Sequence, residues 1–149
     1  MLIEDHRAAQ ALRQADGWRD AVTLAALPLI ALGHVQPDYV QGIIDNTEEY
    51  GPYYIIAPGV ALPHARPEQG ALSNGVAFTT LSKPVEFGHD EGDPVWLLIC
   101  ISATDAEQHI YTIQRLANLL QQDEFIQRLK QATTDSELYD LLSAVSTDA

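Results

Sequence analysis

The sequence has a single cysteine, no long hydrophobic run and few positive charges among its 149 residues. Cys100 cannot form a disulfide within the chain, and its place in the apolar segment 95–101 favours a buried structural thiol over a catalytic one. No apolar stretch approaches the roughly 20 residues needed to span a bilayer. The N-terminus, with Glu4, Asp5 and Arg7, lacks the apolar core of a signal peptide. We therefore expect a cytoplasmic protein that does not insert into the membrane.

Positive charge is scarce: eight lysine and arginine residues stand against 21 aspartate and glutamate residues, a formal net charge of −13. Nucleic acids and anionic membrane surfaces are bound by basic patches, so this balance argues against both as partners. The acidity has two explanations, solubility and the steering of a basic docking partner. Hydrophobic residues make up 46% of the chain, which suffices for one core, and we expect a single domain over residues 1–149.

Hydrophobic periodicity predicts helices at both ends of the chain and strands in the middle. Weak helical spacing at Ala8, Leu12 and Ala15 covers the first fifteen residues. Asp105-x-x-Gln108 and Thr134-x-x-Glu137 resemble capping boxes that start helices. The elements expected with definite positions are helices at 18–32 and 37–50, strands at 55–57, 60–62, 75–81 and 95–102, and helices after Asp105, at 124–130 and after Thr134. This order predicts an α/β fold with helices on both faces of a mixed sheet.

One histidine lies on an unusually restricted piece of backbone. The β-prone run 54–62 breaks at Pro58-Gly59 and leads to His64, which lies between Pro63 and Arg66-Pro67. Proline fixes its own φ and favours an extended residue before it, so the segment loses little entropy on folding. A neutral imidazole nitrogen is a good nucleophile. His64 is therefore a candidate reactive residue, and the alternative is a polar loop residue.

The same residues resemble a known signature. The segment 49–65 is similar to the phosphorylation site of phosphotransferase-system enzyme IIA components of the mannitol/fructose type. The matching residues are Glu49, then, after six residues, Ile56-Ala57, and then Val60-Ala61-Leu62-Pro63-His64-Ala65. Phe87-Gly88-His89-Asp90, Asp93-Pro94 and the segment from Asp105 to His109 also match the family, so the resemblance covers nearly the whole chain. The motifs closest to the ascorbate-specific branch are Gly51-Pro52-Tyr53, Ile56-Ala57-Pro58-Gly59 and His64-Ala65-Arg66-Pro67-Glu68.

The resemblance implies a three-layer sandwich with about five strands in its central sheet, and a phosphotransferase that uses no cofactor and no metal. A histidine-containing phosphocarrier protein would donate a phosphoryl group to Nε2 of His64, whose Nδ1–H would be held by a backbone carbonyl. The group would pass to enzyme IIB, onto a cysteine. The membrane permease, enzyme IIC, would then place it on a sugar or sugar acid, either ascorbate-like or a pentitol or hexitol.

Two further residues are candidates for the site. If Asp105 caps a helix, His109 lies in its first turn on the inward side, and the first-turn amides there favour anions. The family has a second histidine in this context, so the resemblance assigns His109 to stabilising the phosphorylated state, whereas spacing alone favours a core histidine with its hydrogen bonds satisfied. The family's functional arginine, sixteen residues before the phosphorylated histidine, is Glu48 here. Arg66 could replace the missing charge, and the alternative is a solvated Arg66 paired with Glu68.

Other interpretations remain open. Tyr50, Tyr53 and Tyr54 are explained either by core and edge packing or by an apolar docking rim around His64. A hydrolytic metal site could combine His64 and His109 with His89 and with Asp90 or Glu68, although no HExxH or paired-cysteine spacing supports it. A regulatory phosphohistidine module that is not coupled to transport is the alternative function.

Overall fold

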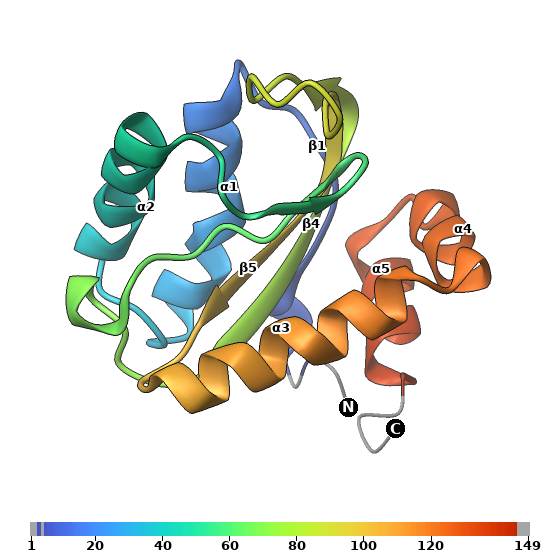
Figure 1. Cartoon of the computed structure of the whole chain (residues 1–149). Coiled ribbons are helices and arrows are strands. Elements are labelled where there is room, and N and C mark those ends of the chain that lie inside the picture. Colours follow the sequence, from blue (N-terminus) through green and yellow to red (C-terminus); the bar gives the residue numbers. More distant parts are fainter. Residues whose placement is uncertain (1–2, 4, 146–149) are drawn as a thin grey trace.

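A five-stranded mixed sheet forms the centre of the molecule (Figure 1). The computed structural model describes residue 3 and residues 5–145 of the chain. The strands, in their order across the sheet, are β1 (Ala9–Arg13), β4 (Gly75–Val85), β5 (Val95–Ser102), β3 (Val60–Ala61) and β2 (Ile55–Ala57). β1 pairs parallel with β4 and β3 parallel with β5, whereas β4–β5 and β2–β3 are antiparallel. The expected mixed sheet is confirmed.

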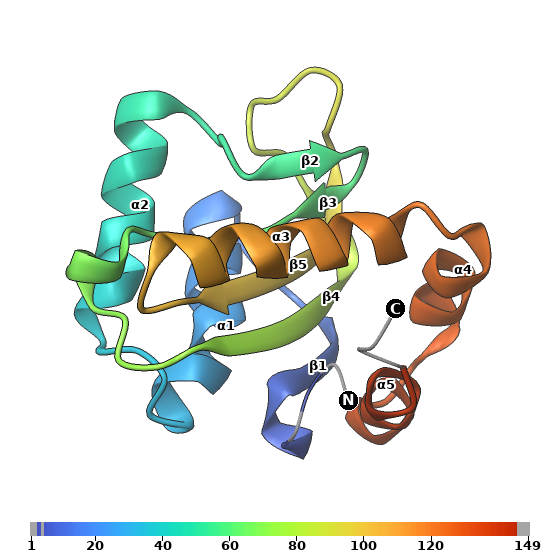
Figure 2. The same ribbon diagram turned by 60° about the horizontal axis from the view of Figure 1, so that its bottom comes forward.

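Helices cover both faces of this sheet (Figures 1 and 2). One face carries α1 (Trp18–Ala31) and α2 (Asp38–Tyr50). The other carries α3 (Ala106–Leu120), α4 (Asp123–Gln131) and α5 (Asp135–Ser143). Two short 3₁₀ helices, η1 (His6–Ala8) and η2 (Pro67–Gln69), lie in the connections. The predicted three-layer α/β sandwich is therefore confirmed. Among the described residues, no helix is long and apolar enough to cross a membrane.

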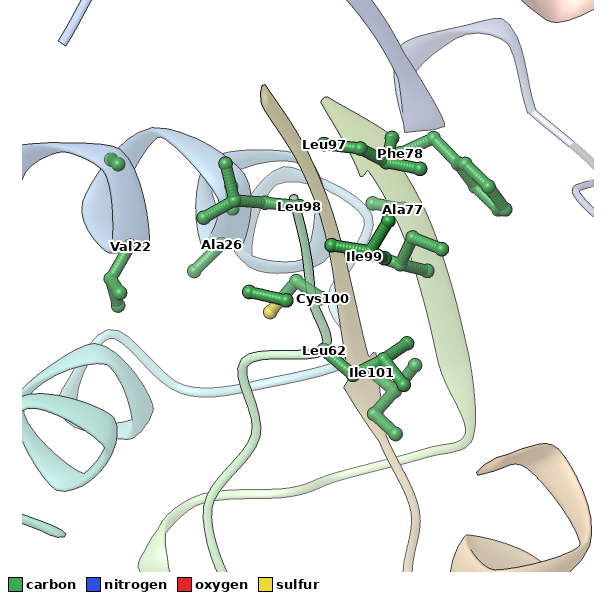
Figure 3. Packing of buried hydrophobic residues seen from close by; sticks show 14 of the residues in the cluster. Val22, Ala26, Leu62, Ala77, Phe78, Leu97, Leu98, Ile99, Cys100 and Ile101 are labelled. Atoms are coloured by element: carbon green, nitrogen blue, oxygen red, sulfur yellow. The ribbon is translucent and has the colours of Figure 1, made fainter. Parts of the chain in front are cut away.

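The core is centred on β5, which is buried between the two helical layers. Every residue from Leu97 to Ile101 has no exposed surface, because side chains on both faces of the strand meet helices. Figure 3 shows Leu98 and Cys100 on the side of β5 that faces Val22 and Ala26 of α1. Cys100 has no exposed surface, so the predicted burial of this thiol is confirmed, and the burial raises its pKa to about 12.

The helical spacing in the first fifteen residues gave a wrong expectation. The segment forms η1 and then β1, which pairs Ala9 with Phe78 of β4. The partners of this strand lie far away in the chain: Asp135 accepts the Ala11 N–H at 2.7 Å, and the Thr80 hydroxyl accepts the Leu12 N–H at 2.8 Å. Alanines at helical spacing are a weak local signal, and these long-range bonds override it.

Candidate active site

A tight hairpin at the edge of the sheet presents His64. β2 and β3 are joined through Pro58-Gly59, where Gly59 has φ +80° and a Cβ would lie 2.6 Å from the Trp96 ring. Only glycine fits this turn without strain. β3 then pairs with β5 through Val60 and Leu97, so the chain leaves the sheet at Leu62 in a fixed direction. The hairpin thereby places His64 just beyond the edge of the core.

The two ring nitrogens of His64 are in different environments. Nδ1 lies 2.7 Å from the carbonyl oxygen of Leu62, and because a carbonyl only accepts, Nδ1 carries the proton and Nε2 keeps its lone pair. The pKa of His64 is lowered to about 4: desolvation is the main cause, the hydrogen bond to Leu62 opposes it, and the neighbouring His109 makes a smaller contribution that also lowers the pKa. At neutral pH the ring is therefore an uncharged nucleophile.

His109 stands beside His64, as expected. The two ring centroids are 4.3 Å apart with an interplanar angle of 64°. His109 lies in the first turn of α3, is partly buried, and has its pKa lowered by desolvation. A neutral second imidazole is thus positioned to donate a hydrogen bond to an anion carried by the first.

The amides at the start of α3 are less available than the sequence suggested. The Asp105 carboxylate caps the helix by accepting the Gln108 N–H at 2.8 Å, and the Asp105 carbonyl accepts the His109 N–H at 3.2 Å. Glu107 adds a second negative charge in the same turn. This helix end is therefore a weaker anion site than an uncapped one without acidic residues.

A cavity of about 390 Å³ opens in front of the two histidines. Its rim is largely apolar: the exposed fractions are 63% for Tyr50, 42% for Tyr53 and 55% for Ile110. The Tyr53 hydroxyl donates a hydrogen bond to the His64 carbonyl. Tyr54 is only 1% exposed, so of the three tyrosines considered for a docking rim, Tyr50 and Tyr53 are on it and Tyr54 is in the core.

The basic residue nearest His64 in sequence, Arg66, also lines this cavity. Its guanidinium is largely exposed and pairs with Glu68 at 3.0 Å. Glu48, at the position of the family's arginine, pairs with Arg19 of α1 at 3.0 Å. Among the described residues lining the cavity, Arg66 is the one permanent cation, so any guanidinium contribution at the site must come from it.

His89 lies apart from this pair of histidines. Its Nδ1 accepts the Gly92 N–H at 2.9 Å within the loop before β5, and it does not line the cavity. Across residue 3 and residues 5–145, no group of three or more His, Cys, Asp or Glu side chains is arranged to hold a metal ion. The geometry gives no support to the hydrolytic metal site.

Three polar residues that hold the His64 loop were missed by sequence reasoning: Tyr39, Asn46 and Gln69. The Gln69 side-chain carbonyl accepts the Arg66 N–H at 2.8 Å and a hydrogen bond from Asn46 at 2.9 Å. Tyr39 contacts the loop from α2. Tyr39 and Asn46 lie well before the loop in sequence, and we find no local signal that would have connected them to it.

Comparisons with known proteins find similar sequences and structures over nearly the whole chain. The model of the family described as "Phosphoenolpyruvate-dependent sugar phosphotransferase system, EIIA 2" matches residues 3–145. SgcA of Escherichia coli (strain K12) is 54% identical over 142 residues, covering 95% of this chain and 99% of that protein. The ascorbate-specific PTS system EIIA component of the same strain is 38% identical over 148 residues, covering 99% and 96%.

Two solved structures are similar over almost the whole chain. The mannitol-specific cryptic phosphotransferase enzyme IIA CmtB from Escherichia coli has a TM-score of 0.85 and 39% identity, and the match covers 97% of each chain. Enzyme IIAMTL from Escherichia coli, in its complex with phosphorylated enzyme IIBMTL, has a TM-score of 0.82 and 28% identity, and the match covers 97% of this chain and 100% of that one.

Proposed function

Because this chain belongs to the EIIA 2 family of the phosphoenolpyruvate-dependent sugar phosphotransferase system, whose EIIA components are phosphotransferases, we propose that Nε2 of His64 is the atom that carries the phosphoryl group. The observation that carries the proposal is the asymmetry of the His64 ring. Nδ1 is fixed by the Leu62 carbonyl, while Nε2 is left as a neutral nucleophile beside a second imidazole.

The transfer consists of two displacements at phosphorus. In the first, the Nε2 lone pair attacks the phosphohistidine of a phosphocarrier protein; a P–N bond forms at His64, and the electron pair of the broken P–N bond returns to the donor ring. In the second, a nucleophile of enzyme IIB, which we expect to be a cysteine thiolate, attacks the same phosphorus. The electron pair then returns to Nε2, and His64 is regenerated.

His109 has a supporting role in this scheme. Its ring is close enough to donate an N–H to a phosphoryl oxygen, and because desolvation lowers its pKa, it would do so as a neutral imidazole. Charge that develops on the phosphoryl oxygens during transfer would be stabilised by this donor. His109 therefore orients the group without becoming covalently modified.

Arg66 would supply the positive charge that is missing at position 48, where the family has an arginine and this chain has Glu48. In the unphosphorylated protein its partner is the Glu68 carboxylate, and both groups are largely exposed. An exposed ion pair is worth about 1 kcal/mol or less, so a dianionic phosphoryl group nearby can compete for the guanidinium. We propose that Arg66 turns from Glu68 towards phosphorylated His64.

The relatives indicate the partners and the substrate class. The mannitol-system relative forms a complex with its phosphorylated enzyme IIB, and we propose an enzyme IIB partner here too, docked over the apolar rim of Tyr50, Tyr53 and Ile110. We propose the phosphocarrier protein as donor, and enzyme IIC as an indirect partner in the membrane. Relatives of similar identity are specific for ascorbate and for mannitol, and on this ground we propose a sugar, sugar alcohol or sugar acid as the transported substrate.

The test is incubation with phosphoenolpyruvate, enzyme I and the phosphocarrier protein, followed by intact mass measurement under alkaline conditions. The wild type should gain one acid-labile, base-stable phosphoryl group. His64→Ala should gain none, while His89→Ala, which removes a histidine outside the cavity, should be labelled like the wild type. A wild type that stays unlabelled, or a labelled His64→Ala variant, would refute the proposal.

Two further variants test the supporting residues in the same assay. His109→Ala should still accept the label but pass it to enzyme IIB at least tenfold more slowly, since one oriented donor contributes about that much or more. Arg66→Ala should hold less label at equilibrium than Glu68→Gln, which leaves the guanidinium free. If His109→Ala transfers its label at the wild-type rate, the role given to His109 is wrong. If Arg66→Ala and Glu68→Gln hold equal amounts of label, the role given to Arg66 is wrong.

A further inference from the structure

The segment that carries His64 has no regular secondary structure, although its neighbours are deeply buried. Leu62 is 1% exposed and Ala65 is 4% exposed. Such a segment needs partners for its backbone groups, because an unpaired buried N–H or C=O is costly. After the strand ends, side chains supply these partners. The Tyr53 hydroxyl donates to the His64 carbonyl, the Tyr39 hydroxyl accepts the Ala65 N–H, and the Gln69 side-chain carbonyl accepts the Arg66 N–H.

The hydroxyl of Tyr39 occupies a central position in this set. It accepts the Ala65 N–H at 3.1 Å and donates to the Ile101 carbonyl at 2.8 Å, with the Ala65 carbonyl more distant at 3.3 Å. A hydroxyl has one proton and two lone pairs, so this arrangement uses its donor and one acceptor site. Tyr39 has no exposed surface, and desolvation raises its pKa, so the donor proton is retained.

These bonds attach both sides of His64 to the same residue of β5. On the N-terminal side, the Ile101 N–H donates directly to the Pro63 carbonyl at 3.2 Å. On the C-terminal side, the Ile101 carbonyl holds the Tyr39 hydroxyl, which holds the Ala65 N–H. His64 is thus fixed between two attachments to the most buried strand of the sheet, and the second depends on one hydroxyl.

We propose that Tyr39 is a positioning residue for phosphoryl transfer, which fixes the backbone on the C-terminal side of His64 so that Nε2 keeps its place opposite His109. The inference rests on the proposed function of His64. Without the hydroxyl, the Ala65 N–H and the Ile101 carbonyl lose their partner in the core, and the loop must shift to satisfy them. A displacement of about 1 Å at a reacting atom can slow a reaction about 100-fold.

The chain contains a matched control for this hydroxyl. Tyr54 is also almost fully buried, and its hydroxyl pairs with the Thr47 side chain at 3.0 Å within the α2 layer. Tyr39→Phe and Tyr54→Phe each remove one buried hydroxyl of the same kind. A loss of stability alone would affect the two variants alike, whereas a loss of positioning would affect only the first.

The experiment measures phosphoryl uptake from the phosphocarrier protein by wild type, Tyr39→Phe and Tyr54→Phe at several donor concentrations. Tyr39→Phe should lower kcat at least tenfold with less than about a threefold change in KM, because docking is intact while the reacting nitrogen is displaced. Tyr54→Phe should keep the wild-type kcat. The ¹⁵N shifts of His64 should show loss of the single Nδ1–H tautomer only in Tyr39→Phe.

The outcomes separate this inference from the proposed function. A wild type that is not phosphorylated on His64 would refute the function itself. A phosphorylated wild type with equal kcat for the two variants would overturn only the role of Tyr39. If Tyr39→Phe does not fold, hydrogen exchange in the wild type decides: the Ala65 amide should be strongly protected, and exchange at the rate of an unstructured peptide would overturn the role.

Discussion

At the scale of single residues, His64 combines two properties that oppose each other in water. A nucleophilic imidazole must be neutral, yet an exposed histidine is partly protonated near neutral pH. Partial burial lowers its pKa to about 4, and the Leu62 carbonyl fixes the proton that remains on Nδ1. The same burial that completes the core around the hairpin thus keeps Nε2 available for a phosphoryl group.

This arrangement predicts a specific pH dependence of stability. The native pKa of His64, about 4, lies below the ordinary value of 6.5, so between these values the unfolded chain binds more protons. The free energy of unfolding should therefore fall as the pH is lowered from 6.5 towards 4, by up to about 3 kcal/mol more in the wild type than in His64→Gln. Denaturant titrations of both proteins across this range, with NMR titration of the His64 ring, measure the effect.

The comparison with His64→Gln cancels the titration of carboxylates that the two proteins share. Parallel stability curves for the two proteins, or an NMR pKa for His64 close to the ordinary value, would show that the ring is not desolvated as described.

Sequence reasoning located the candidate site residues where the signal was local. His64 is marked by its flanking prolines, and the position of His109 follows from the Asp105 cap four residues before it. Tyr39 could not be recognised in this way, because its partners, Ala65 and Ile101, lie 26 and 62 residues away. A tyrosine in the first turn of an amphipathic helix predicts burial, and nothing in its neighbourhood indicates what its hydroxyl will contact.

At the scale of elements, the helices follow from local sequence signals, whereas β1 depends on partners that are distant in the sequence. α2 ends directly before Gly51 and α1 ends two residues before Gly33, while α3 and α5 start at side chains that cap their own helices, so their bounds follow from neighbouring residues. β1 forms because its backbone pairs with β4 and because its Ala11 N–H donates a hydrogen bond to the Asp135 carboxylate of α5. Such distant pairing leaves only a short alanine-rich pattern in the local sequence, which also fits a helix.

The cap of α3 predicts a result that links helix stability to the candidate site. Asp105→Ala removes the acceptor of the Gln108 N–H and should cost about 1 kcal/mol of unfolding free energy, whereas Asp105→Asn keeps a cap and should cost less than about 0.5 kcal/mol. Asp105→Asn also removes a negative charge next to the cavity-lining Ala106, so if His64 carries the phosphoryl group as proposed, the phosphorylated fraction at equilibrium should rise about two- to fivefold. Denaturant unfolding and intact mass measure the two effects.

Thr134→Ala provides the control, because Thr134 caps α5 in the same way by accepting the Glu137 N–H at 3.1 Å. It should lower stability like Asp105→Ala but leave the phosphorylated fraction unchanged, since α5 contributes no residue to the cavity lining, whereas α3 contributes Ala106, His109 and Ile110. An unchanged phosphorylated fraction in Asp105→Asn would mean that the charge at this helix end does not reach the phosphoryl group.

At the scale of the whole molecule, ion pairing leaves few basic side chains free to form a positive patch. Among the residues that the structure describes, five of the eight basic side chains lie in ion pairs with carboxylates: Arg7, Arg13, Arg19, Arg66 and Arg128. Exposed pairs of this kind add little stability, but they neutralise the positive charges locally. Seen from a distance, the protein therefore presents a net charge of −13 with few compensating patches.

Such a charge should steer a basic donor protein towards the site and make its association sensitive to salt. Raising the ionic strength from about 0.02 M to about 0.5 M shortens the Debye length severalfold, so kcat/KM for phosphoryl uptake from the phosphocarrier protein should fall about tenfold or more, while kcat stays nearly constant. Uptake from phosphoramidate, a small donor with no basic surface, should not fall over the same range and serves as the control. If kcat/KM with the protein donor does not change with salt, the acidic surface serves solubility and has no part in recognising the donor.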